Sequence, residues 1–170
     1  MHGLRPRAER AAPFLSLVAL AVATSCARAQ QRVGPQPELR VDAIDVRSLR
    51  EGTLHVGAGL GVPVGLYARL AVVAAGGVTR RIDGDHGSGR VDVVVRFLFD
   101  PFREARWGLS VGGGMSVAHV AREEWRELLV IALDVEAPPV RRRVVPAVQV
   151  GLGGGARIGI VMRPYQQGRR

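Results

Sequence analysis

Three residues in one stretch of the chain have the side chains that nucleophilic catalysis uses. Ser116 could supply a hydroxyl, His119 a general base and Glu123 the acid that orients the base. The stretch around Ser116 alternates apolar and small residues, which predicts a β-strand, and residues three apart on a strand point to opposite faces. Ser116 and His119 therefore meet only if a bulge intervenes. We expect no catalytic set here, and an enzyme built on these residues stays a distant alternative.

The other histidines and the glycine clusters offer weaker candidates. His86 ends the acidic segment 83–86, whose oxygen atoms could hold Ca²⁺, but the remaining ligands of a calcium loop are missing and a polar turn is favoured. His55 has no partner motif, so we expect a satisfied interior histidine. The glycine clusters 112–114 and 153–155 lack the Lys and Ser/Thr of a phosphate loop. The sequence thus assigns no catalytic, cofactor-binding or metal-binding residue.

The elements that would position these residues are short stretches with an apolar residue at every second position, which is the period of a β-strand. In the clearest stretch, residues 53–62, the apolar set is Leu54, Val56, Ala58, Leu60 and Val62. We expect eight strands, at 38–47, 53–62, 66–79, 90–100, 105–118, 126–136, 143–152 and 156–163. A short helix over 120–131 is the competing interpretation of one segment. Eight strands of about ten residues each predict an all-β, antiparallel up-and-down barrel.

The N-terminal residues read as a secretory signal. Three arginines precede an apolar run at 11–23, and Ala27-Arg28-Ala29 is a small-x-small cleavage site. The predicted organisation is a signal peptide at 1–29, a polar lead at 30–37, the barrel domain at 38–165 and a C-terminal tail at 166–170. Cys26 is the only cysteine and would leave with the signal; a lipid-modified Cys26 is the alternative.

The positive charge of the chain is partly a property of the signal. The whole chain has 24 Lys and Arg against 15 Asp and Glu, a net charge of +9. Removing the signal leaves 20 against 14. The arginines form no stripe interleaved with aromatic residues, so we expect no nucleic-acid partner. The one basic run, 141–143, is interpreted as a solvated turn, with contact to anionic lipid head groups as the sharper alternative.

The composition of the two strand faces favours a membrane barrel over a soluble sheet. One face of most strands is aliphatic, and the other is small or charged, which suits a narrow polar lumen with lipid outside. The residues placed on the lumen face are Arg69, Asp92, Arg96, Asp134, Glu136, Gln149 and Arg157. Six aromatic residues fall near one end of the predicted strands and resemble an aromatic girdle: Tyr67, Phe97, Phe99, Phe102, Trp107 and Tyr165. Core packing of a soluble sheet is the alternative explanation.

The connections are expected to differ in length between the two ends of the barrel. Segments 80–89 and 119–125 are predicted to be long outer loops, and 63–65 and 101–104 short inner turns. These two outer loops would be the surface exposed to the outside.

In strand count and alternation, residues 38–165 resemble the small eight-stranded outer-membrane barrels of the OmpA-like transmembrane type. The resemblance implies assembly by the outer-membrane insertion machinery and a packed polar interior without a wide pore. Tyr165 departs from the pattern, because it is out of phase with Ile158, Ile160 and Met162. We therefore expect a non-enzymatic protein of the outer membrane of a Gram-negative bacterium, monomeric, in contact with outer-membrane lipids and lipopolysaccharide, with a structural or surface-interaction role. The alternatives are a soluble periplasmic or secreted β-sandwich that binds a partner and, third, a lipid-modifying barrel enzyme.

Overall fold

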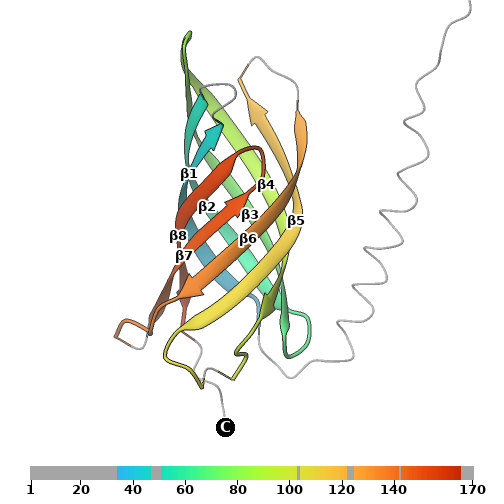
Figure 1. Cartoon of the computed structure of the whole chain (residues 1–170), viewed down its shortest axis with the longest axis vertical. Helices are drawn as coiled ribbons and strands as arrows, with labels where there is room; N and C mark the ends of the chain where they lie inside the picture. The colour runs from blue at the N-terminus through green and yellow to red at the C-terminus, as the bar shows by residue number, and fades with distance from the viewer. Residues whose placement is uncertain (1–33, 47–50, 103, 122–124, 142, 166–170) are drawn as a thin grey trace, which may run out of the picture. The chain divides into compact units, whose positions relative to one another are not determined.

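The computed structural model of the protein describes residues 34–46, 51–102, 104–121, 125–141 and 143–165. These residues form eight antiparallel strands in one closed sheet, in which each strand pairs with the next along the chain (Figure 1). The strands are β1 (Gln36–Val46), β2 (Glu51–Pro63), β3 (Ala68–Arg81), β4 (Gly84–Leu98), β5 (Gly108–Val120), β6 (Arg126–Glu136), β7 (Val144–Leu152) and β8 (Ala156–Pro164). No helix in the described segments is long and apolar enough to cross a bilayer.

The sheet closes because β8 returns to pair with β1. The register runs from Leu39 opposite Met162 to Asp45 opposite Ala156. This confirms the predicted up-and-down barrel and excludes a two-sheet sandwich for the described chain. Antiparallel strands place alternate connections at the same end, so the barrel has two distinct rims. We call the end with connections 64–67, 99–107 and 137–143 the terminal rim, because β1 begins and β8 ends there, and the opposite end the far rim (Figure 1).

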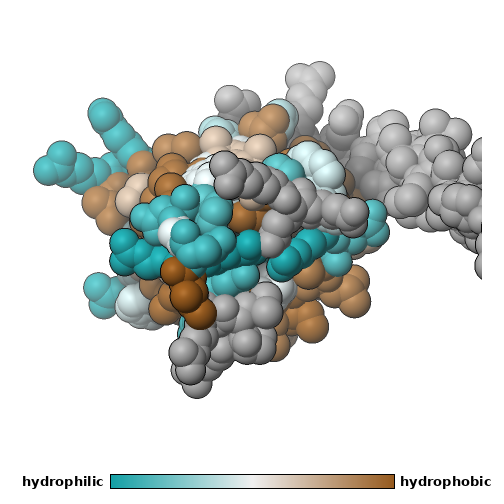
Figure 2. Space-filling view, turned by 90° about the horizontal axis from the view of Figure 1, so that it is seen from above, coloured by the Kyte–Doolittle hydropathy of each residue, from teal (hydrophilic) through white to brown (hydrophobic). Residues whose placement is uncertain are grey.

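The strand faces are sorted in the reverse of a soluble barrel. The outward positions of all eight strands carry exposed large apolar side chains, which we call the apolar wall. Central examples from five of the strands are Val41, Val56, Val93, Ile131 and Ile160. The inward positions carry mainly polar, charged or small residues, together with six buried branched apolar side chains: Ile44, Val73, Val94, Val130, Val145 and Val161. Seen from the far rim, hydrophobic residues gather around the periphery and hydrophilic residues across the middle (Figure 2).

The first strand differs from its sequence-based description. Residues 30–37 were expected to form a polar lead, but β1 begins at Gln36 and its alternation is regular. Its buried positions include Asp42 and Ile44, and Asp45 is exposed. In the sequence Asp42, Asp45 and Arg47 interrupt the apolar residues of this stretch, but Asp42 is an inward position of a regular strand. The expected signal peptide and tail lie outside the described residues.

The prediction of a long outer loop at 80–89 is wrong. β3 continues to Arg81 and β4 begins at Gly84, so only Ile82 and Asp83 lie between them. Gly84 has a φ of +129°, a conformation that suits glycine at a tight corner. Backbone pairing extends through this polar stretch, from Thr79 opposite His86 to Arg81 opposite Gly84. The sequence showed no apolar–polar alternation here, because both faces of this hairpin meet solvent and carry polar residues.

The expected difference in loop length is also reversed. The terminal rim carries the longer connections, 99–107 and 137–143, and the far rim carries 82–83, 121–125 and 153–155. At the far rim the chain is extended by long strands and not by long loops, because β3 and β4 have 14 and 15 residues. The alternative of a short helix over 120–131 is wrong for the described residues of that segment, because Arg126 begins strand β6.

Candidate functional site

The barrel interior holds a set of charged side chains with almost no solvent exposure. Among the described residues, five arginines and five carboxylates at inward positions are buried, none of them more than 7% exposed. We call this set the interior network: Glu38, Arg40, Asp42, Arg90, Asp92, Arg96, Asp134, Glu136, Arg157 and Arg163. The formal charges balance, and each member lies within 4.0 Å of an oppositely charged group. Pairing of this kind offsets the desolvation cost of burying ions.

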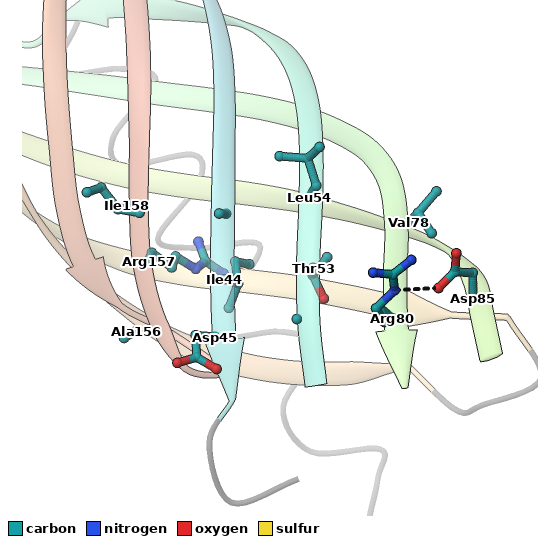
Figure 3. A pocket seen from close by; sticks show the side chains of 12 residues that line it. Ile44, Asp45, Thr53, Leu54, Val78, Arg80, Asp85, Ala156, Arg157 and Ile158 are labelled. Atoms are coloured by element: carbon teal, nitrogen blue, oxygen red, sulfur yellow. Dashed lines mark hydrogen bonds and ion pairs between the residues drawn. The ribbon is translucent and has the colours of Figure 1, made fainter. Parts of the chain in front are cut away.

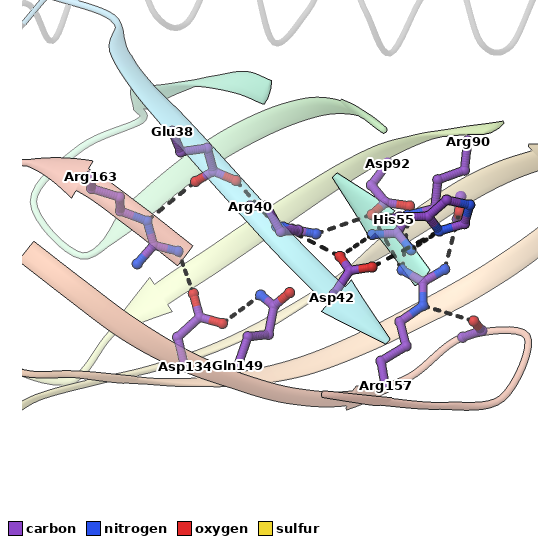
Figure 4. Close-up of polar contacts among 12 residues, drawn as sticks. Glu38, Arg40, Asp42, His55, Arg90, Asp92, Asp134, Gln149, Arg157 and Arg163 are labelled. Carbon is purple, nitrogen blue, oxygen red and sulfur yellow. Dashed lines mark hydrogen bonds and ion pairs between the residues drawn. The ribbon is translucent and has the colours of Figure 1, made fainter. Parts of the chain in front are cut away.

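Near the terminal rim, Glu38 on β1 accepts hydrogen bonds from two arginines on other strands. Arg96 donates through Nη1 to Oε2 at 2.8 Å and through Nη2 to Oε1 at 3.1 Å, a forked contact that fixes the guanidinium plane. Arg163 donates through Nε to Oε2 at 3.2 Å. Arg163 also donates to Asp134 at 2.5 Å (Figure 4). A third hydrogen bond runs from Arg163 to Glu136 at 2.7 Å. Strands β1, β4, β6 and β8 are thereby joined across the lumen.

Near the far rim, Asp92 on β4 is the shared acceptor for two arginines, as Glu38 is near the terminal rim. It accepts from Arg90 Nε at 3.1 Å and from Arg157 Nη1 at 3.2 Å. Arg90 also donates through Nη2 to Asp42, and Arg157 donates through Nη2 to the Ser116 hydroxyl at 3.3 Å. This half of the network ties β1, β4, β5 and β8 together.

Arg40 connects the two halves of the interior network. Its Nη2 donates to Glu38 Oε1 at 3.2 Å, and its Nη1 donates to Asp92 Oδ2 at 3.2 Å (Figure 4). A continuous set of ion pairs therefore runs along the lumen. Such a set cross-links the strands across the lumen.

His55 is a satisfied interior histidine, as expected. Its Nδ1 lies 3.0 Å from Arg90 Nη1, and its Nε2 lies 3.0 Å from Ser88 Oγ. A guanidinium can only donate, so Nδ1 accepts and the network assigns the ring proton to Nε2, which donates to Ser88. The imidazole is neutral in this arrangement and links β2 to Ser88 and Arg90 of β4.

The structure confirms the inward placement of six predicted lumen residues. Asp92, Arg96, Asp134, Glu136, Gln149 and Arg157 are buried, and Arg69 is half-buried. Gln149 donates to Asp134 at 2.5 Å. The charged residues of β1 were missed, although Glu38, Arg40 and Asp42 recur with a period of two. That recurrence of opposite charges was the signal that could have found them.

Ser116 and His119, the nucleophile and base of the enzyme alternative, do not come together in the structure. Ser116 is fully buried in the lumen, and its hydroxyl accepts a hydrogen bond from Arg157. His119 belongs to the outward-facing positions of β5, where its ring stacks on Trp125 with 4.8 Å between centroids. No bulge brings the two together, since both keep their ladder partners, Ser116 opposite Asp92 and His119 opposite Gly89. Glu123 lies outside the described residues.

The remaining sequence candidates lie at the rims. His86 Nε2 is 3.3 Å from Asp83 Oδ2 on the β3–β4 hairpin. No cluster of three potential metal ligands occurs in the part of the chain that the structure describes. Arg141 and Arg143 are exposed on the terminal rim. The glycines at 153–155 form the tight β7–β8 turn, all three at positive φ. Cys26 lies outside the described residues.

A hollow lies across β8, β1, β2, β3 and the start of β4 near the far rim (Figure 3). Its lining is largely aliphatic and comes mainly from outward positions, including Leu54, Val78 and Ile158. Charged residues border it, and Arg80 pairs with Asp85 at 3.2 Å. The one hydroxyl in the lining, on Thr53, bonds Thr79 at 2.9 Å. The hollow therefore lacks a nucleophile with an adjacent base and belongs to the apolar wall.

No protein-family model matches the chain, and no curated protein matches it in sequence. Function is therefore inferred from the geometry alone.

Proposed function

We propose that this protein is a non-enzymatic β-barrel of the outer membrane, similar in architecture to the small OmpA-like transmembrane barrels, with a structural or surface-interaction role. The observation that carries the proposal is the inverted sorting of side chains. The apolar wall covers all eight strands, while ten charged residues are buried inside. Water would favour the opposite arrangement, whereas lipid favours this one.

The closed sheet supports the same conclusion. In hydrocarbon every backbone amide and carbonyl needs an internal partner, and a closed barrel supplies these without a sheet edge. Each strand here pairs on both sides with a neighbour. The strands have 9 to 15 residues, enough for the 9–11 that a tilted membrane strand needs. Large exposed apolar surfaces are rare on soluble monomers, so a soluble barrel accounts poorly for the apolar wall.

The interior network supports a structural role rather than transport. Its charges are balanced and paired along the lumen, so we expect no stable ion conductance. Without free sheet edges along the barrel, the protein has no obvious strand-pairing surface, which favours a monomer. Its partners would be the outer-membrane insertion machinery during assembly, and lipids with lipopolysaccharide afterwards.

The test is the behaviour of the full chain, expressed with its N-terminal residues in a Gram-negative host. We expect it in the detergent-extracted outer-membrane fraction, with a band that migrates differently before and after boiling. The matched variants are Ile160→Arg on the apolar wall and Ile82→Arg at the hairpin tip. Wild type and Ile82→Arg should both show the heat shift, and Ile160→Arg should lose it. Recovery of wild type in the soluble periplasmic fraction without a heat shift would overturn the proposal.

A further inference from the structure

The β7–β8 hairpin lies between β6 and β1 in the closed sheet, and the two seams that bound it are the shortest of the barrel (Figure 1). β7 pairs with β6 over six residues, 147–152 opposite 131–136, and β8 pairs with β1 over seven, 156–162 opposite 39–45. In the described chain the other six seams each pair nine to fourteen residues. Because an antiparallel ladder forms about one backbone hydrogen bond per residue pair, we expect this hairpin to have the fewest hydrogen bonds to the rest of the sheet.

A proline weakens the β6–β7 seam at its terminal-rim end. The carbonyl of Pro146 accepts a hydrogen bond from the Ala137 amide at 2.8 Å, but proline has no amide hydrogen to donate in return. The ladder therefore ends there with one hydrogen bond in place of two. Inside the lumen, Gln149 donates to Asp134 at 2.5 Å, and β7 contributes no charged side chain to the interior network. Few interactions thus join β7 directly to β6.

Two arginines of β8 fasten the hairpin through the lumen. Arg163 donates to Asp134 and Glu136 on β6, so its side chain reaches past β7 to the next strand. It also donates to Glu38 on β1 and therefore bridges both strands that flank the hairpin. Arg157, at the other end of β8, is bonded to acceptors on β4 and β5. Side-chain contacts thus hold the hairpin where its backbone pairing is short.

We propose that the β7–β8 hairpin, residues 144–164, is a latched flap that separates from β6 while the other seams stay paired. Local opening of a fold starts where the fewest hydrogen bonds must break, and the β6–β7 seam is the shortest and lacks a donor at Pro146. The flap stays attached to β1 through β8, and the contacts of Arg163 with Asp134 and Glu136 are the latch that keeps it closed. When these contacts break, the lumen opens sideways and exposes two buried carboxylates of β6. The flap follows from the closed sheet, wherever the barrel resides.

Amide hydrogen exchange of the full chain in detergent micelles tests the flap, because alternate residues of β7 donate to β6 and to β8. When the flap opens, the amides that donate to β6 lose protection and those that donate to β8 keep it. We expect the first set to exchange at least about tenfold faster than the second. Amides between β3 and β4, the longest seam, are the reference for opening of the whole barrel. Equal exchange of the two sets of β7 amides would overturn the flap.

Two variants should change the exchange of the β7 amides that donate to β6 in opposite directions. Pro146→Ala supplies the missing donor without changing any charge, and we expect it to slow this exchange by about fivefold. Arg163→Gln removes the latch and should speed the exchange relative to the β3–β4 reference. Arg96→Gln is the matched control, because Arg96 also contacts Glu38 and Asp134 but belongs to β4.

The variants separate the latch from the seam. A selective effect of Arg96→Gln equal to that of Arg163→Gln, or no selective effect of Arg163→Gln, would overturn the latch. Pro146→Ala keeps the interior network intact, so it decides the outcome even where Arg163→Gln forms no barrel. Unchanged exchange in Pro146→Ala would overturn the β6–β7 seam as the point of opening.

Discussion

Arg40 Nη1 lies 3.2 Å from Asp92 Oδ2, and this contact joins β1 to β4 across the barrel lumen. The two residues are 52 positions apart in the chain. Asp92 also accepts from Arg90 and Arg157, so one carboxylate is surrounded by three guanidiniums. The stability of the barrel therefore depends on a few acceptors that each serve several donors.

Removal of the Asp92 charge should destabilise the folded barrel strongly. In Asp92→Asn three buried guanidiniums lose their shared counter-charge, and leaving buried charge uncompensated costs about 3–5 kcal/mol. Urea unfolding in detergent micelles, followed by the gel heat shift, measures the change. Asp83→Asn on the exposed hairpin is the control and should change stability by no more than about 0.5 kcal/mol. Equal effects of the two substitutions would contradict the role of the interior network.

A charge on the apolar wall should oppose insertion. Ile160 is about half exposed on β8 and opposite Val41 and Val148 in the ladders. Arginine at the middle of a lipid-facing strand costs about 2–4 kcal/mol. We expect Ile160→Arg to fold into lipid vesicles with lower yield, measured as the fraction of heat-modifiable protein, and Ile160→Leu to match wild type. Normal insertion of the arginine variant would argue against lipid at this position.

Close packing between β4 and β5 should make Gly114 intolerant of a side chain. A Cβ at Gly114 would lie 1.9 Å from the carbonyl oxygen of Val93, closer than any real contact, so the strands must separate. At the neighbouring Gly113 the nearest atom would be 3.7 Å away. We expect Gly114→Ala to lower the free energy of unfolding by about 1–3 kcal/mol. Gly113→Ala should be neutral, and a comparison of their urea midpoints tests both.

The orientation of the barrel can be measured with single cysteines, since Cys26 is the only natural one. With the terminal rim toward the periplasm, Ile82→Cys at the β3–β4 hairpin should react with a membrane-impermeant maleimide on intact cells. Glu104→Cys on the terminal rim should react only after the outer membrane is opened. The reverse pattern would place the terminal rim at the cell surface and contradict a periplasmic N-terminus of the barrel.

His119 offers a test of the enzyme alternative. In the structure its ring stacks on Trp125 and does not reach Ser116. We therefore expect His119→Ala to leave the lipid composition of the host's outer membrane unchanged, as measured by mass spectrometry of extracted lipids. A modification that appears with the wild-type chain and disappears with His119→Ala would establish the catalytic role.

Much of the fold could be predicted because strand alternation is a local property. The segment 126–136 was bounded correctly, since Leu129, Ile131, Leu133 and Val135 repeat with a clear period of two. The polar hairpin around Gly84 was not predicted, because no apolar face marks strands that are solvated on both sides. Likewise the inward placement of Glu38 and Arg40 was not predicted, because their partners lie on other strands.

The sequence by itself determined the number of strands, their antiparallel order and the division of each strand into an aliphatic and a polar face. These features depend on neighbours in the chain and on the period of the backbone. Only the tertiary structure decided which face is inside, because that depends on closure of β8 onto β1. Closure also brought Arg163 to Glu38, 125 residues away, and no local pattern specifies which charges meet across a lumen.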